Sequence, residues 1–285
     1  MILLDGKSLS QKISESLASR IKDLGFSPVL AIIQIGAIEE SNVYIKHKKA
    51  FADKIGAKVS HIILPSDVKE EEVIEKISEL NNDDSTQGII LQLPIPENLD
   101  KRKLIEAINP LKDVDGLHSV NQSKIFQGDD SGIIPATPKG VMSLLREYKI
   151  NLEGKKAIVV GRSLLVGRPM AMLLLKENAT VTIAHSKTQN LRDLINESDI
   201  VVVAVGKAGL VTKDMVKAGQ VIVDVGTNSI VGPKTLEEIE TRKLVGDVVF
   251  DDVKDIVGGI SPVPGGVGPM TVASLFQNLF DIVAR

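Results

Sequence analysis

One lysine lies close to one of the chain's two tyrosines. Tyr44 and Lys48 are four residues apart in a segment, 42–55, whose pattern predicts a helix, so both face the same side. A tyrosine ring can stack on a flat heterocycle, and a partly buried lysine can exchange protons near neutral pH. We expect the neighbouring Lys46 and Lys49 to lower the pKa of Lys48 further. A basic helix face in water is the alternative interpretation.

Two polar residues further along could complete such a site. Gln92 interrupts an apolar run at the end of a predicted strand, 88–93, the edge at which open α/β sheets bind ligands. Its carboxamide could donate and accept there, or be satisfied within a core. Asp115 precedes Gly116, where its carboxylate could accept two N–H groups from an amino-pyrimidine edge or cap a turn.

A glycine-containing turn joins a predicted strand to a predicted helix. Residues 161–169 read Gly-Arg-Ser-Leu-Leu-Val-Gly-Arg-Pro. In this context the backbone can approach a pyrophosphate, and the helix N-terminus offers free N–H groups. Ser163 stands where the usual dinucleotide fingerprint has its second glycine, so a tight turn without a ligand remains the alternative.

The strand that follows this helix, 180–184, ends without an acidic residue. An enzyme that uses NAD commonly has Asp or Glu there to bind the ribose 2′-hydroxyl. Arg162, Ser186 and Lys187 could instead hold a phosphate, because a guanidinium matches phosphate oxygens. The pattern favours NADP over NAD, although solvated loop residues would look the same.

The stretch Ile260–Thr271 is the most unusual in composition. Three prolines and three glycines fall within residues 262–269, directly before a predicted helix. Such a loop can be rigid and can bring backbone N–H groups against a ligand. A rigid surface connection is the alternative.

Strand-like and helix-like segments alternate along the chain, which predicts an α/β fold with parallel sheets. Strands are predicted at 29–35, 59–64, 88–93, 156–160, 180–184, 200–205 and 221–225, and helices at 8–24, 42–55, 68–80, 139–149, 168–177, 191–196 and 270–285. The polar segment Gln127–Thr137 is the predicted boundary between two α/β units.

Composition excludes several classes of protein. The net charge of the 285 residues is -3, so nothing indicates a nucleic-acid partner. The chain has no cysteine, and its four histidines are scattered, which argues against disulfides, thiolate chemistry and a metal site. The longest apolar strip, Ile200–Val205, is too short for a membrane span, and the N-terminus lacks a secretory pattern. We expect a cytoplasmic protein.

Six motifs, in order along nearly the whole chain, resemble the bifunctional methylenetetrahydrofolate dehydrogenase/methenyltetrahydrofolate cyclohydrolase family. They are Tyr44-Ile-Lys-His-Lys48, Gln92-Leu-Pro, Lys112-Asp-Val-Asp-Gly116, Gly161-Arg-Ser-x-x-Val-Gly-Arg-Pro169, His185-Ser-x-Thr188 and Pro262-Val-Pro-Gly-Gly-Val-Gly-Pro-Met-Thr271. The resemblance implies oxidation of 5,10-methylenetetrahydrofolate with NADP and hydrolysis of the product to 10-formyltetrahydrofolate.

The resemblance also implies a two-domain α/β fold and a homodimer. An aminoacid-dehydrogenase-like folate domain would comprise residues 1–137 and 266–285, and a Rossmann NADP-binding domain residues 138–265. The last helix is expected to pack on the first domain. A different NADP dehydrogenase of this architecture, a dehydrogenase without hydrolysis and a non-catalytic nucleotide sensor are the competing hypotheses.

The resemblance assigns roles by position. Lys48 would be the catalytic lysine, assisted by Gln92, while Tyr44 stacks on the folate and Asp115 holds the pterin edge. The remaining folate contacts would be Leu91, Leu93, Pro264, Gly265 and Gly266, and the NADP contacts Gly161, Arg162, Ser163, Ser186 and Thr227. The chain departs from the family pattern at Gly36–Ser41, at Asn121–Ser123 and at Thr227, where isoleucine is usual.

Overall fold

The computed structural model describes residues 1–36, 39–234 and 240–285, and only the backbone at 39–40, 231–234 and 240–242. It divides the chain into two compact units. The three-stranded unit comprises Gln11–Ala136 and Val272–Arg285, and the six-stranded unit comprises Met1–Ser10 and Thr137–Thr271. Part of the atypical Gly36–Ser41 segment, residues 37–38, lies outside the described residues.

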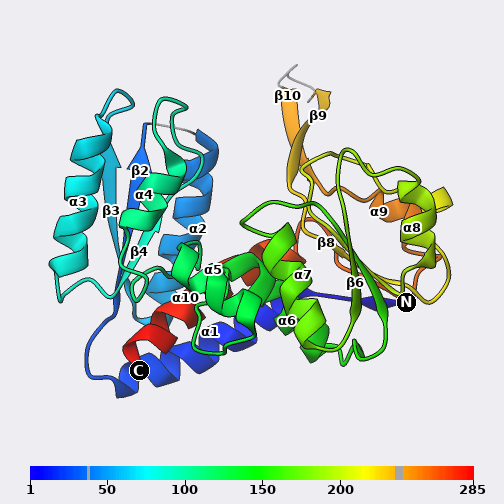
Figure 1. Ribbon diagram of the computed structural model, residues 1–285, viewed down its shortest axis with the longest axis horizontal. Coiled ribbons are helices and arrows are strands. Elements are labelled where there is room, and N and C mark those ends of the chain that lie inside the picture. The colour runs from blue at the N-terminus through cyan, green and yellow to red at the C-terminus, as the bar shows by residue number, and fades with distance from the viewer. Residues whose placement is uncertain (37–38, 235–239) are drawn as a thin grey trace. The chain divides into compact units, whose positions relative to one another are not determined.

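The sheet of the three-stranded unit is parallel, with strand order β3-β2-β4 (Figure 1). Its strands are β2 (Val29–Ile35), β3 (Lys58–Leu64) and β4 (Gly88–Leu91). Alternate residues of β2 point to opposite faces, and both faces are buried and apolar except at Gln34, so each must be covered by helices.

Helices cover both faces of this sheet. One face packs against α3 (Glu70–Asn82) and α4 (Lys101–Ala107) through residues such as Ile33 and Ile77. The other face packs against α1 (Gly6–Asp23), α2 (Glu39–Ile55) and α10 (Val267–Val283). A further helix, α5 (Ser119–Gln127), follows the loop that carries Asp115.

The C-terminal helix completes the core of the three-stranded unit. Phe276 is fully buried, and its ring stacks on Phe51 of α2 with 5.3 Å between centroids. The guanidinium of Arg20 lies 4.0 Å from the centroid of the Phe280 ring, a cation–π contact between α1 and α10. The last part of the chain therefore packs where the resemblance places it.

The sheet of the six-stranded unit is parallel throughout, with strand order β1-β11-β8-β7-β5-β6. Its strands are β1 (Ile2–Leu3), β5 (Lys156–Val160), β6 (Thr180–Ala184), β7 (Ile200–Val203), β8 (Val221–Asp224) and β11 (Gly259–Ile260). Its other elements are the helices α6 (Ala136–Glu147), α7 (Gly167–Lys176), α8 (Leu191–Glu197) and α9 (Phe250–Val253), the short 3₁₀ helix Lys213–Met215, and an antiparallel hairpin of β9 (Asn228–Lys234) and β10 (Glu240–Val245) (Figure 1).

The strand order creates a switch point beside β5. The chain leaves β5 to form β6 on one side and then returns to form β7 on the other side. The connections diverge at the carboxyl ends of β5 and β7, which opens a site for a ligand in this class of sheet.

Every helix and strand predicted from the sequence is present, with ends displaced by at most three residues. The short strands β1 and β11, the helices α4, α5 and α9, and the hairpin were not predicted. Residues 1–10 were expected in the first domain, whereas β1 pairs with β11 and belongs to the six-stranded unit. Among the residues that the structure describes, no helix has the length and apolar character needed to cross a membrane.

The Phe51–Phe276 stack leads to a stability prediction. We expect Phe276→Ala to lower the free energy of unfolding by about 3–5 kcal/mol, because it leaves a cavity in a closed core. Phe126→Ala is the matched control, since Phe126 is 76% exposed and its truncation should change stability by about 0.5 kcal/mol or less. Urea unfolding followed by circular dichroism measures both; equal effects would show that α10 is not part of this core.

Candidate active site

A lysine, a carboxamide and a carboxylate form the candidate site in the three-stranded unit. The Lys48 ammonium, on α2, donates to Gln92 Oε1 over 2.8 Å. Gln92 directly follows β4 and is largely buried, and its Nε2 donates to the Leu93 carbonyl over 2.8 Å. Both ends of the carboxamide are thus engaged, which fixes the oxygen toward Lys48.

Burial governs the charges in this site. Desolvation lowers the pKa of Lys48 below its ordinary value, and the charge of Asp115 partly opposes that change. Burial raises the pKa of Asp115 to about 6, while Lys48 acts to lower it. The expected role of Lys46 and Lys49 is therefore corrected, because loss of water, and not neighbouring cations, lowers the pKa of Lys48.

Tyr44 lies one helical turn before Lys48 on α2, and 44% of its surface is exposed. The ring is therefore accessible to a ligand. Leu91 differs, because it is buried in the core of this unit and pairs with Ile33 in the sheet. Leu93 packs partly against the same core.

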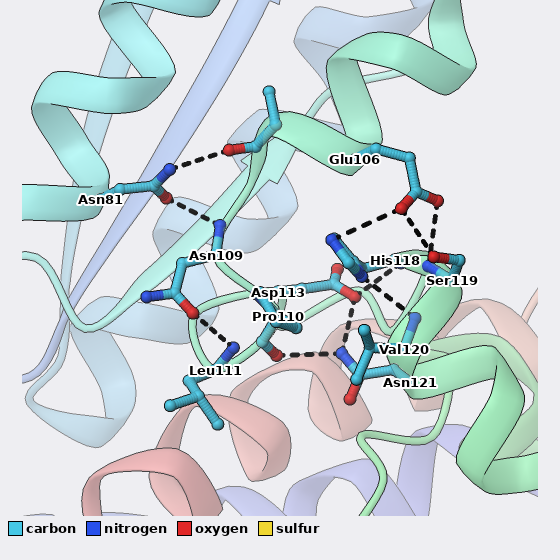
Figure 2. Close-up of polar contacts among 11 residues, drawn as sticks. Asn81, Glu106, Asn109, Pro110, Leu111, Asp113, His118, Ser119, Val120 and Asn121 are labelled. Carbon is cyan, nitrogen blue, oxygen red and sulfur yellow. Dashed lines mark hydrogen bonds and ion pairs between the residues drawn. The ribbon is translucent and has the colours of Figure 1, made fainter.

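A buried carboxylate supports the loop that carries Asp115. Asp113 Oδ2 accepts from the His118 N–H over 2.8 Å and from Asn121 Nδ2 over 3.0 Å (Figure 2). Asn121 also donates to the Pro110 carbonyl over 3.0 Å. This network joins both ends of the loop, so Asp115 is carried on a tightly held backbone.

Two further contacts hold the same loop. The Ile89 N–H of β4 donates to the Lys112 carbonyl over 2.7 Å. From α10, Asn278 Nδ2 donates to the carbonyls of Val114 and Ile134, each over 2.8 Å. Sequence reasoning missed Asp113 and Asn121; the Asp-x-Asp pattern at 113–115 was the available signal, but it does not say which carboxylate turns inward.

The glycine turn after β5 is closely packed against the end of the neighbouring strand β7. Gly161 has φ +132°, and a Cβ there would lie 2.3 Å from the Ala204 carbonyl oxygen, so only glycine fits. Ser163 Oγ accepts from the N–H groups of Val166 and Gly167 over 3.1 and 3.4 Å. The turn runs directly into the N-terminus of the ten-residue helix α7.

Arg162 and Ser186 follow neighbouring strands. Val160 of β5 and Ala184 of β6 are register partners, and Arg162 and Ser186 each lie two residues beyond them, exposed to solvent. The turn at Ser186 is shaped by the His185 N–H, which donates to Thr188 Oγ1 over 2.8 Å. This end of the sheet therefore offers a cation and a hydroxyl, with no carboxylate in the β6 turn.

Three further predicted residues belong to the loop before α10. Pro264, Gly265 and Gly266 lie in the six-stranded unit, where the Gly265 carbonyl accepts from the Lys7 N–H over 2.9 Å. Thr227 is exposed beyond the end of β8. The contacts predicted for these four residues remain predictions.

The residues of the glycine turn fit a dinucleotide. A glycine that admits no side chain, the N-terminal end of a helix and an exposed cation lie at the carboxyl end of a parallel sheet, where pyrophosphates bind. Within the described part of the chain, no cluster of three or more His, Asp or Glu side chains could hold a metal ion. The structure thus defines a dinucleotide-binding α/β protein with a lysine site in its other unit.

Comparisons with known proteins agree with this class. Sequence models of the tetrahydrofolate dehydrogenase/cyclohydrolase family match the chain in two parts, the catalytic domain at residues 4–115 and the NAD(P)-binding domain at residues 135–285. The bifunctional protein FolD of Methanospirillum hungatei JF-1 is 46% identical over 281 residues, covering 99% of this chain and 97% of that protein.

Solved structures give the same result. The bifunctional FolD methylenetetrahydrofolate dehydrogenase/cyclohydrolase from Campylobacter jejuni has a TM-score of 0.92 at 41% identity, covering 100% of this chain and 99% of that one. The methylenetetrahydrofolate dehydrogenase-cyclohydrolase from Trypanosoma brucei, solved with NADP and an inhibitor, has a TM-score of 0.94 at 34% identity with the same coverage. The chain belongs to the tetrahydrofolate dehydrogenase/cyclohydrolase family, as the motifs predicted.

The raised pKa of Asp115 predicts a pH-dependent stability difference. Its folded pKa of about 6 exceeds the ordinary 3.8, so the folded state binds a proton that the unfolded state releases between these values. Raising the pH from 4 to 7 should therefore destabilise the wild type relative to Asp115→Asn by up to about 3 kcal/mol, at 1.36 kcal/mol per pKa unit. Urea unfolding at each pH measures the difference; parallel pH profiles would contradict the desolvated carboxyl.

Proposed function

We propose that this chain carries out both reactions of its family, with Lys48 as the group that moves protons. It oxidises 5,10-methylenetetrahydrofolate with NADP and hydrolyses the methenyl product to 10-formyltetrahydrofolate. The observation that carries the assignment to Lys48 is its ammonium, desolvated and hydrogen-bonded to Gln92 beside Asp115.

The oxidation depends on alignment of the methylene carbon with the hydride acceptor more than on acid–base catalysis. The methylene carbon between N5 and N10 gives up a hydride, and the nitrogen lone pairs stabilise the resulting cation. NADP supplies the hydride acceptor when it is bound. The residues of this chain orient the substrate: Tyr44 would stack on the folate, and the ionised Asp115 would accept N–H groups of the pterin edge.

The hydrolysis needs a proton carrier. Water adds to the methenyl carbon and loses one proton. The bond from that carbon to N5 then breaks as N5 gains a proton, and the added hydroxyl gives up its own proton to water as it becomes the formyl carbonyl, so one proton is released overall. A neutral Lys48 amine could take the first proton and return one to N5. The lowered pKa makes the neutral amine accessible, and the hydrogen bond to Gln92 Oε1 orients the nitrogen.

The cofactor contacts follow from the six-stranded unit. Gly161 and Ser163 would bind the pyrophosphate at the start of α7, while Arg162 and Ser186 would hold the ribose 2′-phosphate. Thr227, beyond β8, would contact the nicotinamide half. The exposure of Arg162 and Ser186 beyond paired strands supports the phosphate site.

A cytoplasmic homodimer completes the proposal. The hairpin of β9 and β10 lies outside the six-stranded sheet, and it leaves Ile230 and Leu244 about 40% exposed. By the register of the hairpin these two side chains lie on opposite faces, so each face presents one accessible apolar group to which a second copy could pack. Analytical ultracentrifugation of the purified protein would give its mass in solution.

Replacing Lys48 should separate the two halves of the proposal. Lys48→Met is expected to reduce hydrolysis of 5,10-methenyltetrahydrofolate at least about 100-fold, because it removes the proton carrier. NADP binding should stay within about twofold, since the cofactor residues lie in the other unit. The exposed neighbour Lys46→Met serves as the control and should hydrolyse like the wild type. A Lys48→Met protein with near-normal hydrolysis would remove Lys48 from this role.

Replacing Arg162 should change the choice of cofactor. Arg162→Gln is expected to raise the KM for NADP about tenfold or more, because a charge-assisted contact to phosphate is lost. The KM for NAD, which lacks that phosphate, should hardly change and is the internal control. Formation of reduced nucleotide at 340 nm measures both, and an equal effect on the two cofactors would contradict the phosphate site.

A further inference from the structure

A fully buried carboxylate holds the loop that follows β7. Asp247 Oδ2 accepts from the N–H groups of Val205 and Gly206 over 2.8 and 3.0 Å. Its Oδ1 accepts from the Lys207 N–H over 2.7 Å and from Asn228 Nδ2 over 2.9 Å. Three consecutive backbone donors and one side chain thus converge on a single carboxylate.

A second buried acid fixes Asp247 in turn. Asp224, the last residue of β8, accepts from the N–H groups of Asp247 and Val248 over 3.0 and 2.9 Å. Glycines make room for both carboxylates. A Cβ at Gly226 would lie 2.2 Å from Asp247 Cγ, and one at Gly246 would lie 1.8 Å from Asp224 Oδ2.

The supported loop lies against the glycine turn. Val160 of β5 accepts from the Ala204 N–H over 2.8 Å, and Gly161 has no room for a Cβ because the Ala204 carbonyl lies against it. Residues 205–207 continue directly from Ala204. The donors held by Asp247 therefore sit at the carboxyl end of β7, on one side of the switch point where this class of sheet binds its ligand.

We propose that Asp247 is a positioning residue for NADP, holding the backbone of Val205–Lys207 in the conformation that lines the cofactor site. The inference rests on the proposed placement of NADP at the Gly161 turn. An ionised carboxylate suits this task, because it accepts at both oxygens and strongly satisfies backbone donors. An asparagine would keep one acceptor and direct an NH₂ group at backbone N–H groups, so the loop would shift.

The bifunctional chemistry offers a sharp test. For Asp247→Asn we expect the Kd for NADPH, measured by its fluorescence on binding, to rise about tenfold or more. Hydrolysis of 5,10-methenyltetrahydrofolate without added nucleotide, which depends on Lys48 in the other unit, should stay within about threefold. A merely structural role for Asp247 would lower the affinity for NADPH and the rate of hydrolysis together. Asp252→Asn, an exposed change of the same kind, is the control and should leave the Kd unchanged.

Asn228→Ala is a milder second variant, since it removes one donor and leaves three backbone donors on Asp247. We expect a smaller rise in the Kd, and this variant decides the question if Asp247→Asn does not fold. A wild-type Kd for NADPH in a folded Asp247→Asn protein would overturn the inference. If Asp247→Asn does not fold, a wild-type Kd for NADPH in Asn228→Ala would overturn it. A wild type that fails to bind NADPH would instead overturn the proposed cofactor site.

Discussion

The candidate site rests on one physical constraint: a lysine ammonium that has lost most of its water must still find a hydrogen-bond acceptor. Lys48 meets this constraint through Gln92 Oε1 at 2.8 Å, with Asp115 as the compensating charge. Removing water lowers the pKa of the ammonium, while the carboxamide fixes the direction of the nitrogen without adding a charge of its own. The same burial raises the pKa of Asp115, and the charge of each group partly opposes the change in the pKa of the other.

The fold supports this pair with polar groups placed inside it. Asp113 accepts hydrogen bonds from the loop that carries Asp115, and Asp247 accepts them from the loop after β7. The two carboxylates thus have the same structural role, one in each unit. A loop at the edge of a parallel sheet leaves backbone N–H groups without partners in the sheet, and a buried carboxylate satisfies several of them at once. Both carboxylates are buried, so the loops are held by groups that are shielded from solvent.

Much of the fold could be predicted from apolar periodicity. The continuous apolar runs of β2, β5 and β7 and the spacing in α1 and α10 are strong local signals, and each element formed near its predicted position. β1 and β11 have two residues each and exist only because they pair with each other and with β8, a long-range contact that no local pattern reveals.

The site could be predicted in part. Motifs located Lys48, Gln92 and Asp115, and the structure brings the three into one electrostatic cluster. Partial burial and the neighbouring Lys46 and Lys49 were both expected to lower the pKa of Lys48, and burial is the cause that the structure shows. The sequence could not decide between these causes, because solvent exclusion depends on packing across α2 and β4. Asp113 and Asp247 were missed for a related reason: a buried acid that binds backbone N–H groups looks in sequence like any acid on the surface.

The most direct test is the pKa of the Lys48 ammonium itself. NMR titration of protein labelled with ¹³C at the lysine side chains would give this pKa, with the Lys48 resonance assigned by its loss in a Lys48 variant. We predict a value clearly below the ordinary 10.5. A value at or above 10.5 would show a solvated or ion-paired lysine, and the proton-carrying role derived from its burial would be contradicted.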